Sequence, residues 1–222
     1  MESVKTNRCV IIGGANIGNY PRIRSYLRED DYVIYCDSGL KHREQLDREP
    51  SLIVGDFDSY DNPESDTETI VLPVAKDDTD TVYAVREGIR RGFRDFLLAG
   101  VFGERLDHTL VNAYILFDLD KRGCTAMAVD DYSEMSVISA KDGSSSFGRV
   151  PGKALVEDRY PFFSLLNMTG TAKGITIRGA KFPLEDAEIT SEYQYATSNE
   201  VLPGETAEIT IKEGRLLLIK DI

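Results

Sequence analysis

A change in the hydrophobic pattern near residue 130 constrains the fold more than any other feature of the sequence. Before that point, short apolar runs alternate with segments whose apolar residues recur three and four positions apart, the pattern of a parallel sheet wrapped by helices. From about Ser136 onward, short β-rich segments are separated by turn residues, which indicates an all-β domain. We therefore predict an α/β protein, with a Rossmann-like domain on a parallel sheet in residues 1–135 and a β-sandwich domain in residues 136–222.

The expected elements follow from these two periodicities. In the first domain, strands are expected at residues 9–12, 32–36, 52–54, 69–72, 96–99 and 125–129, and helices at 79–91 and 107–121. In the second domain, strands are expected at residues 162–166, 174–177, 208–211 and 216–219. Residues 141–148 have the composition of a loop or hairpin, so the junction lies at or just before them.

Composition argues against some classes of partner. Asp and Glu total 38 against 26 Lys and Arg, a formal charge of −12, whereas nucleic acids are bound by basic surfaces. The same charge also serves solubility alone. Cys9, Cys36 and Cys124 lack the short spacings of zinc sites and lie in or beside apolar runs, so we interpret them as small buried hydrophobic residues. With neither a charged leader nor a long apolar run, we expect a cytoplasmic protein without membrane association.

Polar clusters follow the expected strands at the points where the strands end. Residues 13–16, 37–39, 55–59 and 103–108 each follow a strand, and residues 76–80 precede a helix. Since the carboxyl ends of parallel strands share one edge of a sheet, we expect these loops to meet there. The carboxylates concerned are Asp37, Asp56, Asp58, Asp77, Asp78, Asp80 and Asp107.

So many carboxylates at one rim are unfavourable without compensating cations. Magnesium takes oxygen ligands and commonly bridges one or two carboxylates to substrate phosphates, while Lys76 and Arg105 would neutralise the remaining phosphate charge. The sequence therefore predicts a site for a magnesium-bound polyphosphate. Each cluster taken alone also has a structural explanation: Asp77 or Asp78 would suit the cap of a helix beginning near Thr79, and the acidic residues after the third strand would suit a turn.

The remaining candidates carry less information. Gly13 and Gly14 fit a tight turn and match neither the dinucleotide fingerprint nor the phosphate loop that ends in Gly-Lys-Ser/Thr. We place His42 on a solvated helix face. His108 lies near an expected helix start, where a neutral ring would donate a hydrogen bond rather than act as an acid.

In order and spacing, the clusters resemble the motifs of the thiamine pyrophosphokinase family. That family carries an Asp-Gly-Gly turn, a Gly-Asp-Phe-Asp-Ser turn, a Lys-Asp-x-Thr-Asp turn and a Gly-x-Arg-x-Asp-His turn. The matching residues here are Asp37-Ser-Gly39, Gly55-Asp-Phe-Asp-Ser59, Lys76-Asp-Asp-Thr-Asp80 and Gly103-Glu-Arg-Leu-Asp-His108. The second half is similar to the family's thiamine-binding β domain at Phe163-Ser-Leu165, Gly174-Ile-Thr176, Gly179-Ala-Lys-Phe-Pro-Leu184 and Ser198-Asn199.

The sequence departs from the family pattern at three of these positions. Ser38 and Glu104 stand where glycine is usual or common among relatives, and Phe182 stands where some relatives place tryptophan.

The resemblance implies transfer of a diphosphoryl group from ATP to the thiamine hydroxyl, giving thiamine diphosphate and AMP, with magnesium as cofactor. It implies catalytic roles for Asp56, Asp58, Asp80, Asp107, Arg105 and Lys76, with Asp56, Asp58 and Asp80 holding the metal and either Asp80 or Asp107 accepting the proton. It implies nucleotide contacts from Asn16, Asp37, Ser59, Asp77, Thr79, Gly103 and His108, and thiamine contacts from Phe182, Ser198 and Asn199. It also implies a homodimer with thiamine sites at the subunit interface.

Other activities remain open on the sequence alone. A pyrophosphokinase for another heterocyclic alcohol, such as a pterin, would use the same acidic rim. A module that binds thiamine diphosphate or nucleotide without catalysis is a second alternative, although the complete acidic set argues against it. A hydrolase using the same metal is a third, and it would release phosphate without thiamine.

Overall fold

The computed structural model describes residues 7–57, 66–73, 75, 77–140 and 150–222 of the chain. The chain divides into two compact units: unit 1 comprises Met1–Ile115 and Ala128–Asp131, and unit 2 comprises Leu116–Met127 and Tyr132–Ile222. The α4 helix, Leu106–Lys121, and the β6 strand, Thr125–Val129, contribute residues to both units. The domain boundary expected after residue 135 stays a prediction, because these units are not continuous stretches of chain.

Unit 1 is built on a parallel sheet. Its strands lie in the order β4-β3-β2-β1-β5, and every neighbouring pair is parallel. Their bounds are Thr69–Val71, Leu52–Gly55, Tyr32–Cys36, Cys9–Ile12 and Asp95–Ala99, in the same order. The central strand β1 is buried along its whole length, as expected for a strand covered on both faces, and its continuous apolar run is the signal that located it. The predicted parallel sheet is confirmed.

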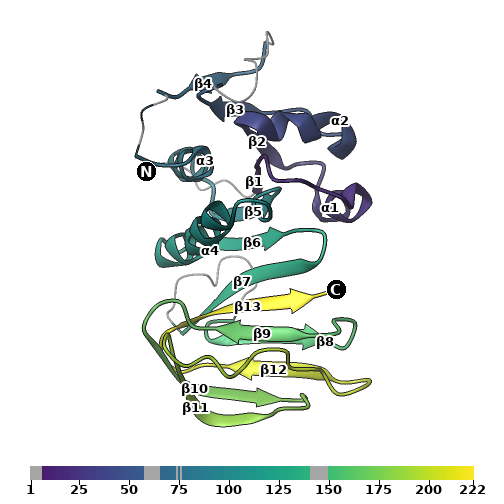
Figure 1. Ribbon diagram of the computed structural model, residues 1–222, viewed down its shortest axis with the longest axis vertical. Helices are drawn as coiled ribbons and strands as arrows, with labels where there is room; N and C mark the ends of the chain where they lie inside the picture. The colour runs from purple at the N-terminus through teal and green to yellow at the C-terminus, as the bar shows by residue number, and fades with distance from the viewer. Residues whose placement is uncertain (1–6, 58–65, 74, 76, 141–149) are drawn as a thin grey trace. The chain divides into compact units, whose positions relative to one another are not determined.

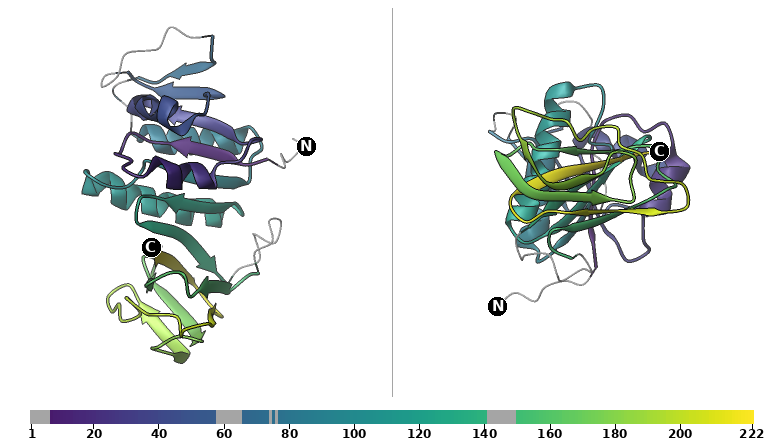
Figure 2. Two further views of the ribbon diagram at one scale, coloured as in Figure 1. Left: turned by 90° about the vertical axis from the view of Figure 1, so that its right-hand side faces the viewer. Right: turned by 90° about the horizontal axis from the view of Figure 1, so that it is seen from below.

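Helices cover both faces of this sheet. The short helices α1, Tyr20–Tyr26, and α2, Arg43–Leu46, lie on one face, and α3, Asp80–Arg90, lies on the other (Figure 1; Figure 2, left). A 3-10 helix, η1, spans Asp37–His42 and connects β2 to α2. The sheet edge where the parallel strands end is therefore framed by loops and by helix starts.

The cap of α3 differs from the sequence expectation. The side chain of Thr79 caps the helix by accepting a hydrogen bond from the Val82 N–H, at 3.4 Å between Oγ1 and N. Asp78 instead forms an ion pair with Arg86. The prediction that Asp77 or Asp78 caps the helix was wrong, because Thr79 already occupies the N-cap position with extended backbone and Asp78 pairs with Arg86, eight residues further along the chain.

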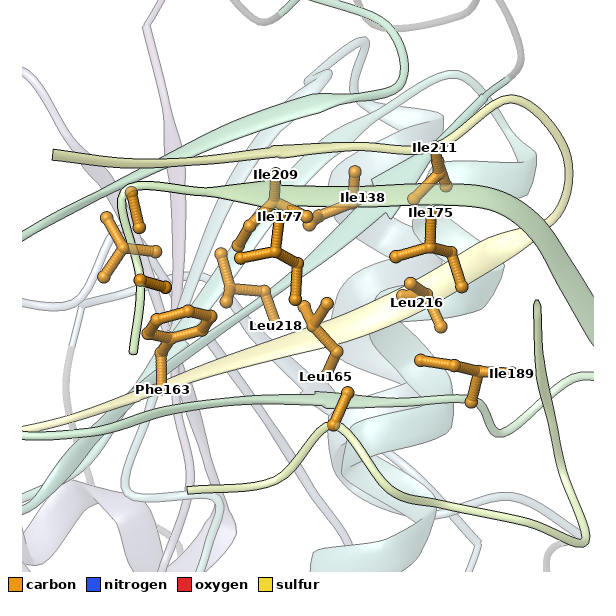
Figure 3. Packing of buried hydrophobic residues seen from close by; sticks show 14 of the residues in the cluster. Ile138, Phe163, Leu165, Ile175, Ile177, Ile189, Ile209, Ile211, Leu216 and Leu218 are labelled. Atoms are coloured by element: carbon orange, nitrogen blue, oxygen red, sulfur yellow. The ribbon is translucent and has the colours of Figure 1, made fainter. Parts of the chain in front are cut away.

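Within the described residues, unit 2 contains two sets of antiparallel strands, one belonging to a nine-stranded sheet and one forming a four-stranded sheet, with one apolar core. One has the order β7-β13-β9, with bounds Ser133–Ser139, Arg215–Asp221 and Phe163–Leu166. The other has the order β11-β10-β12-β8, with bounds Leu184–Thr190, Thr171–Arg178, Thr206–Thr210 and Lys153–Glu157. Figure 3 shows Ile175, Ile177 and Ile209 of the second sheet facing Leu165 and Leu218 of the first. The predicted β-sandwich is confirmed.

Two further expectations were about cysteines and membrane spans. Cys9, Cys36 and Cys124 are buried and form no disulfide, which confirms the interpretation of these residues as small hydrophobic residues. Among the described residues, no helix combines the length and the apolar character needed to cross a bilayer.

Candidate active site

A cavity of about 440 Å³ lies where the parallel strands of unit 1 end. Its walls come from the loops after β1, β2, β3 and β5 and from the starts of α3 and α4. The lining residues are Gly13, Gly14, Ala15, Cys36, Asp37, Ser38, Asp56, Thr79, Asp80, Thr81, Gly100, Val101, Gly103, Glu104, Arg105, His108 and Asn112. Loops separated by up to about ninety residues of chain therefore meet at one cavity, which is what a parallel sheet imposes on the loops at its carboxyl edge.

The residues singled out in the sequence fall into three groups. Asp37, Asp56, Thr79, Asp80, Gly103, Arg105 and His108 line the cavity. Three others are not among the lining residues: Asn16, Asp77 and Asp107. Two of these three contact a side chain that does line the cavity, because Asn16 is hydrogen-bonded to Glu104 and Asp107 is paired with Arg105. Asp58, Ser59 and Lys76, and the predicted loop at 141–148, lie outside the described residues.

Two of the acidic loops are packed directly against each other. Asp37 is buried and adopts a left-handed backbone conformation, with φ of 41°, which costs a residue with a β-carbon about 1–2 kcal/mol. The neighbouring β3 strand ends in Gly55, where an added β-carbon would lie 3.0 Å from the Asp37 Cα. Gly55 therefore lets the loop that carries Asp56 approach Asp37, and the packing between the loops sustains the strained backbone.

The glycine turn after β1 accommodates Ser38, the first of the three departures from the family pattern. A β-carbon at Gly14 would lie only 2.0 Å from the Ser38 Oγ, so the space that glycine leaves at position 14 is used by the serine side chain. The bulkier residue at position 38 is thus tolerated because the opposite position has no side chain.

The second departure has a different explanation. Glu104 has a left-handed backbone, with φ of 43°, the conformation in which glycine is favoured. Its carboxylate accepts a hydrogen bond from the Asn16 side-chain amide. This contact joins the loop after β5 to the loop after β1, and it gives Glu104 a role that a glycine would not have.

Cationic groups lie beside the acidic ones. The Arg105 guanidinium donates hydrogen bonds to both Asp107 carboxylate oxygens, at 3.1 and 2.5 Å, and lowers the pKa of Asp107 to about 2. Lys41, which the sequence analysis did not single out, donates from its ammonium to the Gly14 carbonyl oxygen at 2.5 Å. Its only sequence signal was its place two residues after Gly39, within a helical turn that the periodicity did not reveal.

The prediction that His42 lies on a solvated face was wrong. The side chain is buried, and its two ring nitrogens contact the Tyr20 hydroxyl at 2.8 Å and the Ala15 carbonyl oxygen at 2.9 Å. Burial lowers the pKa of His42, although the hydrogen bond to Ala15 acts in the opposite direction. The 3-10 helix η1, which was not predicted, turns this residue inward.

Cys36 also lines the cavity, but its thiol is unreactive. Burial, aided by nearby Asp80, raises the pKa of its thiol well above the ordinary value. A protonated, buried thiol is a poor nucleophile. The chemistry of the cavity therefore belongs to its carboxylates, its cations and the N-terminal ends of α3 and α4, which favour anions.

A second cavity, of about 240 Å³, lies in unit 2. It is lined by Ile177, Phe182, Leu184, Tyr195, Ala196, Thr197 and Asn199. Phe182 is 56% exposed. Its backbone is held by the Asn199 side-chain amide, which accepts a hydrogen bond from the Phe182 N–H at 3.0 Å and donates one to the Phe182 carbonyl at 2.8 Å. Ser198 is not among the lining residues; its N–H donates to the Ser164 hydroxyl.

Two family models match the chain. Residues 23–128 match the catalytic domain of thiamin pyrophosphokinase, and residues 154–216 match the vitamin B1 binding domain of the same enzyme. The chain belongs to the thiamin pyrophosphokinase family. It is an enzyme with a thiamin pyrophosphokinase catalytic domain, which carries out ATP-dependent pyrophosphoryl transfer, and a domain that binds thiamin. The first match includes the lining of the larger cavity apart from Gly13–Ala15, and the second includes the whole lining of the smaller one.

Solved thiamin pyrophosphokinase structures share the fold. The Bacillus subtilis enzyme is 20% identical, with 97% of this chain and 99% of that chain covered and a TM-score of 0.82. The Geobacillus thermodenitrificans enzyme is 24% identical, with 97% of this chain and 97% of that chain covered and a TM-score of 0.78. The Candida albicans enzyme is 14% identical, with 97% of this chain and 89% of that chain covered and a TM-score of 0.75. No curated protein sequence matches the chain. At these identities the structural likeness establishes the fold, and the family models establish the family.

Proposed function

We propose that the cavity of unit 1 binds ATP through its polyphosphate, and that the thiamine hydroxyl attacks the β-phosphorus so that AMP leaves. One observation carries this proposal: Asp37, Asp56 and Asp80, from three loops distant in sequence, line one cavity. Residues of the N-terminal turns of α3 and α4 also line this cavity, and the N-terminal end of a helix favours phosphate. Carboxylates and anion-binding groups at one place suit a polyphosphate that arrives with cations.

The donor set is compatible with magnesium. Among the described residues, no three His, Cys, Asp or Glu side chains form a group that would hold a metal by themselves. Magnesium does not require such a cage, because it keeps several waters and is typically held by one or two carboxylates together with substrate phosphates. We assign Asp56 and Asp80 to this role, together with Asp58 on the same loop as Asp56. When bound, the ion would neutralise charge that develops on the transferred phosphates.

The charged residues around the metal site receive supporting roles. Arg105 would bind phosphate oxygens through its planar guanidinium, and Asp107 would orient it beforehand. Lys76 is proposed as a second phosphate-binding cation, and Lys41, at the Gly14 carbonyl, would add a third. The low pKa of Asp107 makes it a weak proton acceptor at neutral pH, so of the two candidates for the base we favour Asp80.

The remaining nucleotide contacts are proposed around the same rim. Asp37 would reach the nucleotide or the metal shell, and Asn16 would act together with Glu104, to which it is hydrogen-bonded. Backbone and side-chain contacts are proposed from Ser59, Asp77, Thr79, Gly103 and His108.

We place the thiamine in the cavity of unit 2. The thiazolium of thiamine is a permanent cation, and an aromatic face attracts such a cation by about 0.5–2 kcal/mol. Phe182 offers an exposed ring, and the Lys181 ammonium already lies 5.6 Å from its centroid, so the ring face is in a position that accepts positive charge. Asn199 would position Phe182, and Ser198 remains a proposed contact of the thiamine.

A homodimer is the proposed assembly. Leu106, Leu110 and Tyr114 form an exposed apolar row on α4, at four-residue spacing, and Phe182 and Tyr193 are exposed on unit 2. Apolar surfaces of this kind commonly mark protein interfaces. The three buried cysteines form no disulfide, which fits the reducing cytoplasm that we propose as the compartment.

The proposed function is tested by AMP release. The assay is run with thiamine, with a pterin alcohol and with neither, each in magnesium and in chelator. We expect AMP only with thiamine and magnesium. Asp80→Asn should lower turnover at least about 100-fold, the range for loss of a preorganised electrostatic group. Asp118→Asn, which removes an exposed carboxylate paired with Arg122, is the control and should leave turnover unchanged. Full activity of Asp80→Asn, or AMP release in chelator, would contradict the proposal.

A further inference from the structure

A buried histidine outside the cavity lining ties two cavity walls together. His42 is the last residue of η1, and its side chain is almost completely buried, at 1% exposure. One ring nitrogen, Nδ1, lies 2.8 Å from the Tyr20 hydroxyl, and the other, Nε2, lies 2.9 Å from the Ala15 carbonyl oxygen. Both polar atoms of the ring are therefore engaged.

The chemistry of the partners fixes which group donates in each hydrogen bond. A backbone carbonyl can only accept, so the Nε2–H of His42 donates to the Ala15 oxygen. In a neutral ring Nδ1 is then an acceptor, and the Tyr20 hydroxyl must donate to it. Burial of the ring, which lowers the pKa of His42, agrees with the neutral form. Tyr20 thus selects the ring tautomer that can hold Ala15.

The two ends of η1 serve different walls of the cavity. Its first residue is Asp37, which lines the cavity, and its last is His42. The Ala15 peptide unit is held from both sides, because its N–H donates to the Gly100 carbonyl at 2.9 Å and its C=O accepts from His42. This contact therefore ties the end of the glycine turn to η1, and so to Asp37, beside the Lys41 hydrogen bond to the Gly14 carbonyl.

Close packing leaves the turn little freedom to adjust if the contact is lost. A β-carbon at Gly39, in the middle of η1, would lie 2.4 Å from the Ile12 carbonyl oxygen. The segments after β1 and β2 therefore touch backbone to backbone at this point, and further along they are joined by side chains, Lys41 at the Gly14 carbonyl and His42 at the Ala15 carbonyl.

We propose that His42 is a positioning residue of the nucleotide cavity: oriented by Tyr20, it fixes the Gly13–Ala15 turn at the distance from Asp37 that the polyphosphate requires. The proposal rests on the proposed function of that cavity. A direct role in proton transfer is excluded by the geometry, because both ring nitrogens are occupied and the ring does not line the cavity.

The sharpest test compares two tyrosine substitutions. Tyr20→Phe removes the hydroxyl that donates to His42. Tyr35→Phe removes a hydroxyl of the same unit that donates to the Arg48 carbonyl, also at 2.8 Å, without touching the histidine. The dissociation constant of the magnesium complex of a non-hydrolysable ATP analogue is measured by calorimetry without thiamine. We expect about 3- to 10-fold weaker binding for Tyr20→Phe, the range of one net hydrogen bond, and less than about 2-fold change for Tyr35→Phe.

Substitutions of His42 add a rescue experiment. His42→Leu removes both hydrogen bonds and should weaken analogue binding at least about 10-fold, whereas His42→Gln keeps a side-chain N–H that can reach Ala15 and should recover most of the affinity. The KM for thiamine should stay unchanged in both. If His42 had a purely structural role, both variants would have a lower melting temperature, and the affinity for the ATP analogue and the KM for thiamine would change alike.

The outcomes also distinguish this inference from the proposed function. If Asp80→Asn and Asp56→Asn weaken analogue binding but Tyr20→Phe binds like the wild type, the positioning role is overturned and the proposed function stands. The role is equally overturned if Tyr35→Phe weakens binding as much as Tyr20→Phe. If the aspartate variants bind like the wild type, the proposed function fails and this inference falls with it. Should His42→Leu not fold, the tyrosine pair decides.

Discussion

The buried ion pair of unit 2 provides a prediction whose size can be worked out from the structure. Glu134 on β7 and Lys220 on β13 are register partners in the antiparallel pair, with 2.5 Å between carboxylate and ammonium. The Tyr160 hydroxyl donates to the other Glu134 oxygen at 2.8 Å, and the Lys220 ammonium lies 4.4 Å from the Tyr160 ring centroid. Removal of the carboxylate would leave a mostly buried ammonium without its paired charge, with a hydrogen bond to the Tyr160 hydroxyl at 3.2 Å.

We predict that Glu134→Ala destabilises unit 2 by about 3 kcal/mol. Losing one partner of a buried pair costs roughly 3–5 kcal/mol, and the Lys220 side chain, at 17% exposure against 4% for Glu134, can partly regain solvent, which places the cost near the lower end. The double substitution Glu134→Met with Lys220→Met should lie within about 1.5 kcal/mol of the wild type, because replacing a buried pair by apolar side chains is often close to neutral.

Hydrogen exchange measured by mass spectrometry assigns the effect to one unit. Peptides covering 133–139 and 215–221 report on the β7–β13 pair, and peptides covering 9–12 and 32–36 serve as the control in unit 1. The opening free energy of the first pair of peptides should fall by the predicted amount in Glu134→Ala, and that of the second pair should stay constant. The reasoning is refuted if Glu134→Ala costs less than about 1 kcal/mol, or if the double variant costs the sum of the two single ones.

Three further predictions concern the cavities. Gly14→Ala should raise the KM for ATP, because the added β-carbon would lie 2.0 Å from the Ser38 Oγ. A second substitution, Ser38→Gly, should restore the KM, and an unchanged KM in Gly14→Ala would contradict the contact. Asp107 should titrate with a pKa of about 2, below its ordinary value of 3.8. Its interaction with Arg105 therefore stabilises the protein above pH 3.8, and this stabilisation is lost as the pH falls through 2. In Arg105→Gln, carbon NMR should show the titration midpoint of Asp107 returning towards 3.8. Phe182→Ala should raise the KM for thiamine about 3- to 30-fold, the range of a cation–π contact, with ATP binding unchanged; equal loss of both substrates would argue against a thiamine contact.

Much of unit 1 could be predicted from sequence because its strands are buried on both faces. A strand such as β1 must be apolar along its whole length, and the predicted bounds of β1, β2 and β6 agree with the structure. The helices α3 and α4 were found within one residue at each end, since their apolar residues follow the helical period. Parallel pairing then dictates which ends of the strands share an edge, so the meeting of the acidic loops was also predictable.

Other elements carry no such signal. The strand β11, Leu184–Thr190, is largely exposed, so it lacks the alternation that marks a half-buried strand, and it was not predicted; β7 and β8 were missed as well. The helix η1 was missed because a short 3-10 helix is too brief to show a period. That omission produced the wrong expectation for His42, whose burial depends on packing against Tyr20 and Ala15 and not on its neighbours in sequence.

By itself, the sequence determined the α/β pattern of the first half and the β-rich pattern of the second, the edge at which the polar loops gather, and the family motifs, because periodicity and spacing are local properties of the chain. Only the tertiary structure decided how those groups are used: which residue caps α3, that Ser38 fits against Gly14, that Asn199 holds Phe182, and that His42 points inward. These outcomes depend on distances of a few ångströms between segments remote in sequence, and close packing, not local preference, sets such distances.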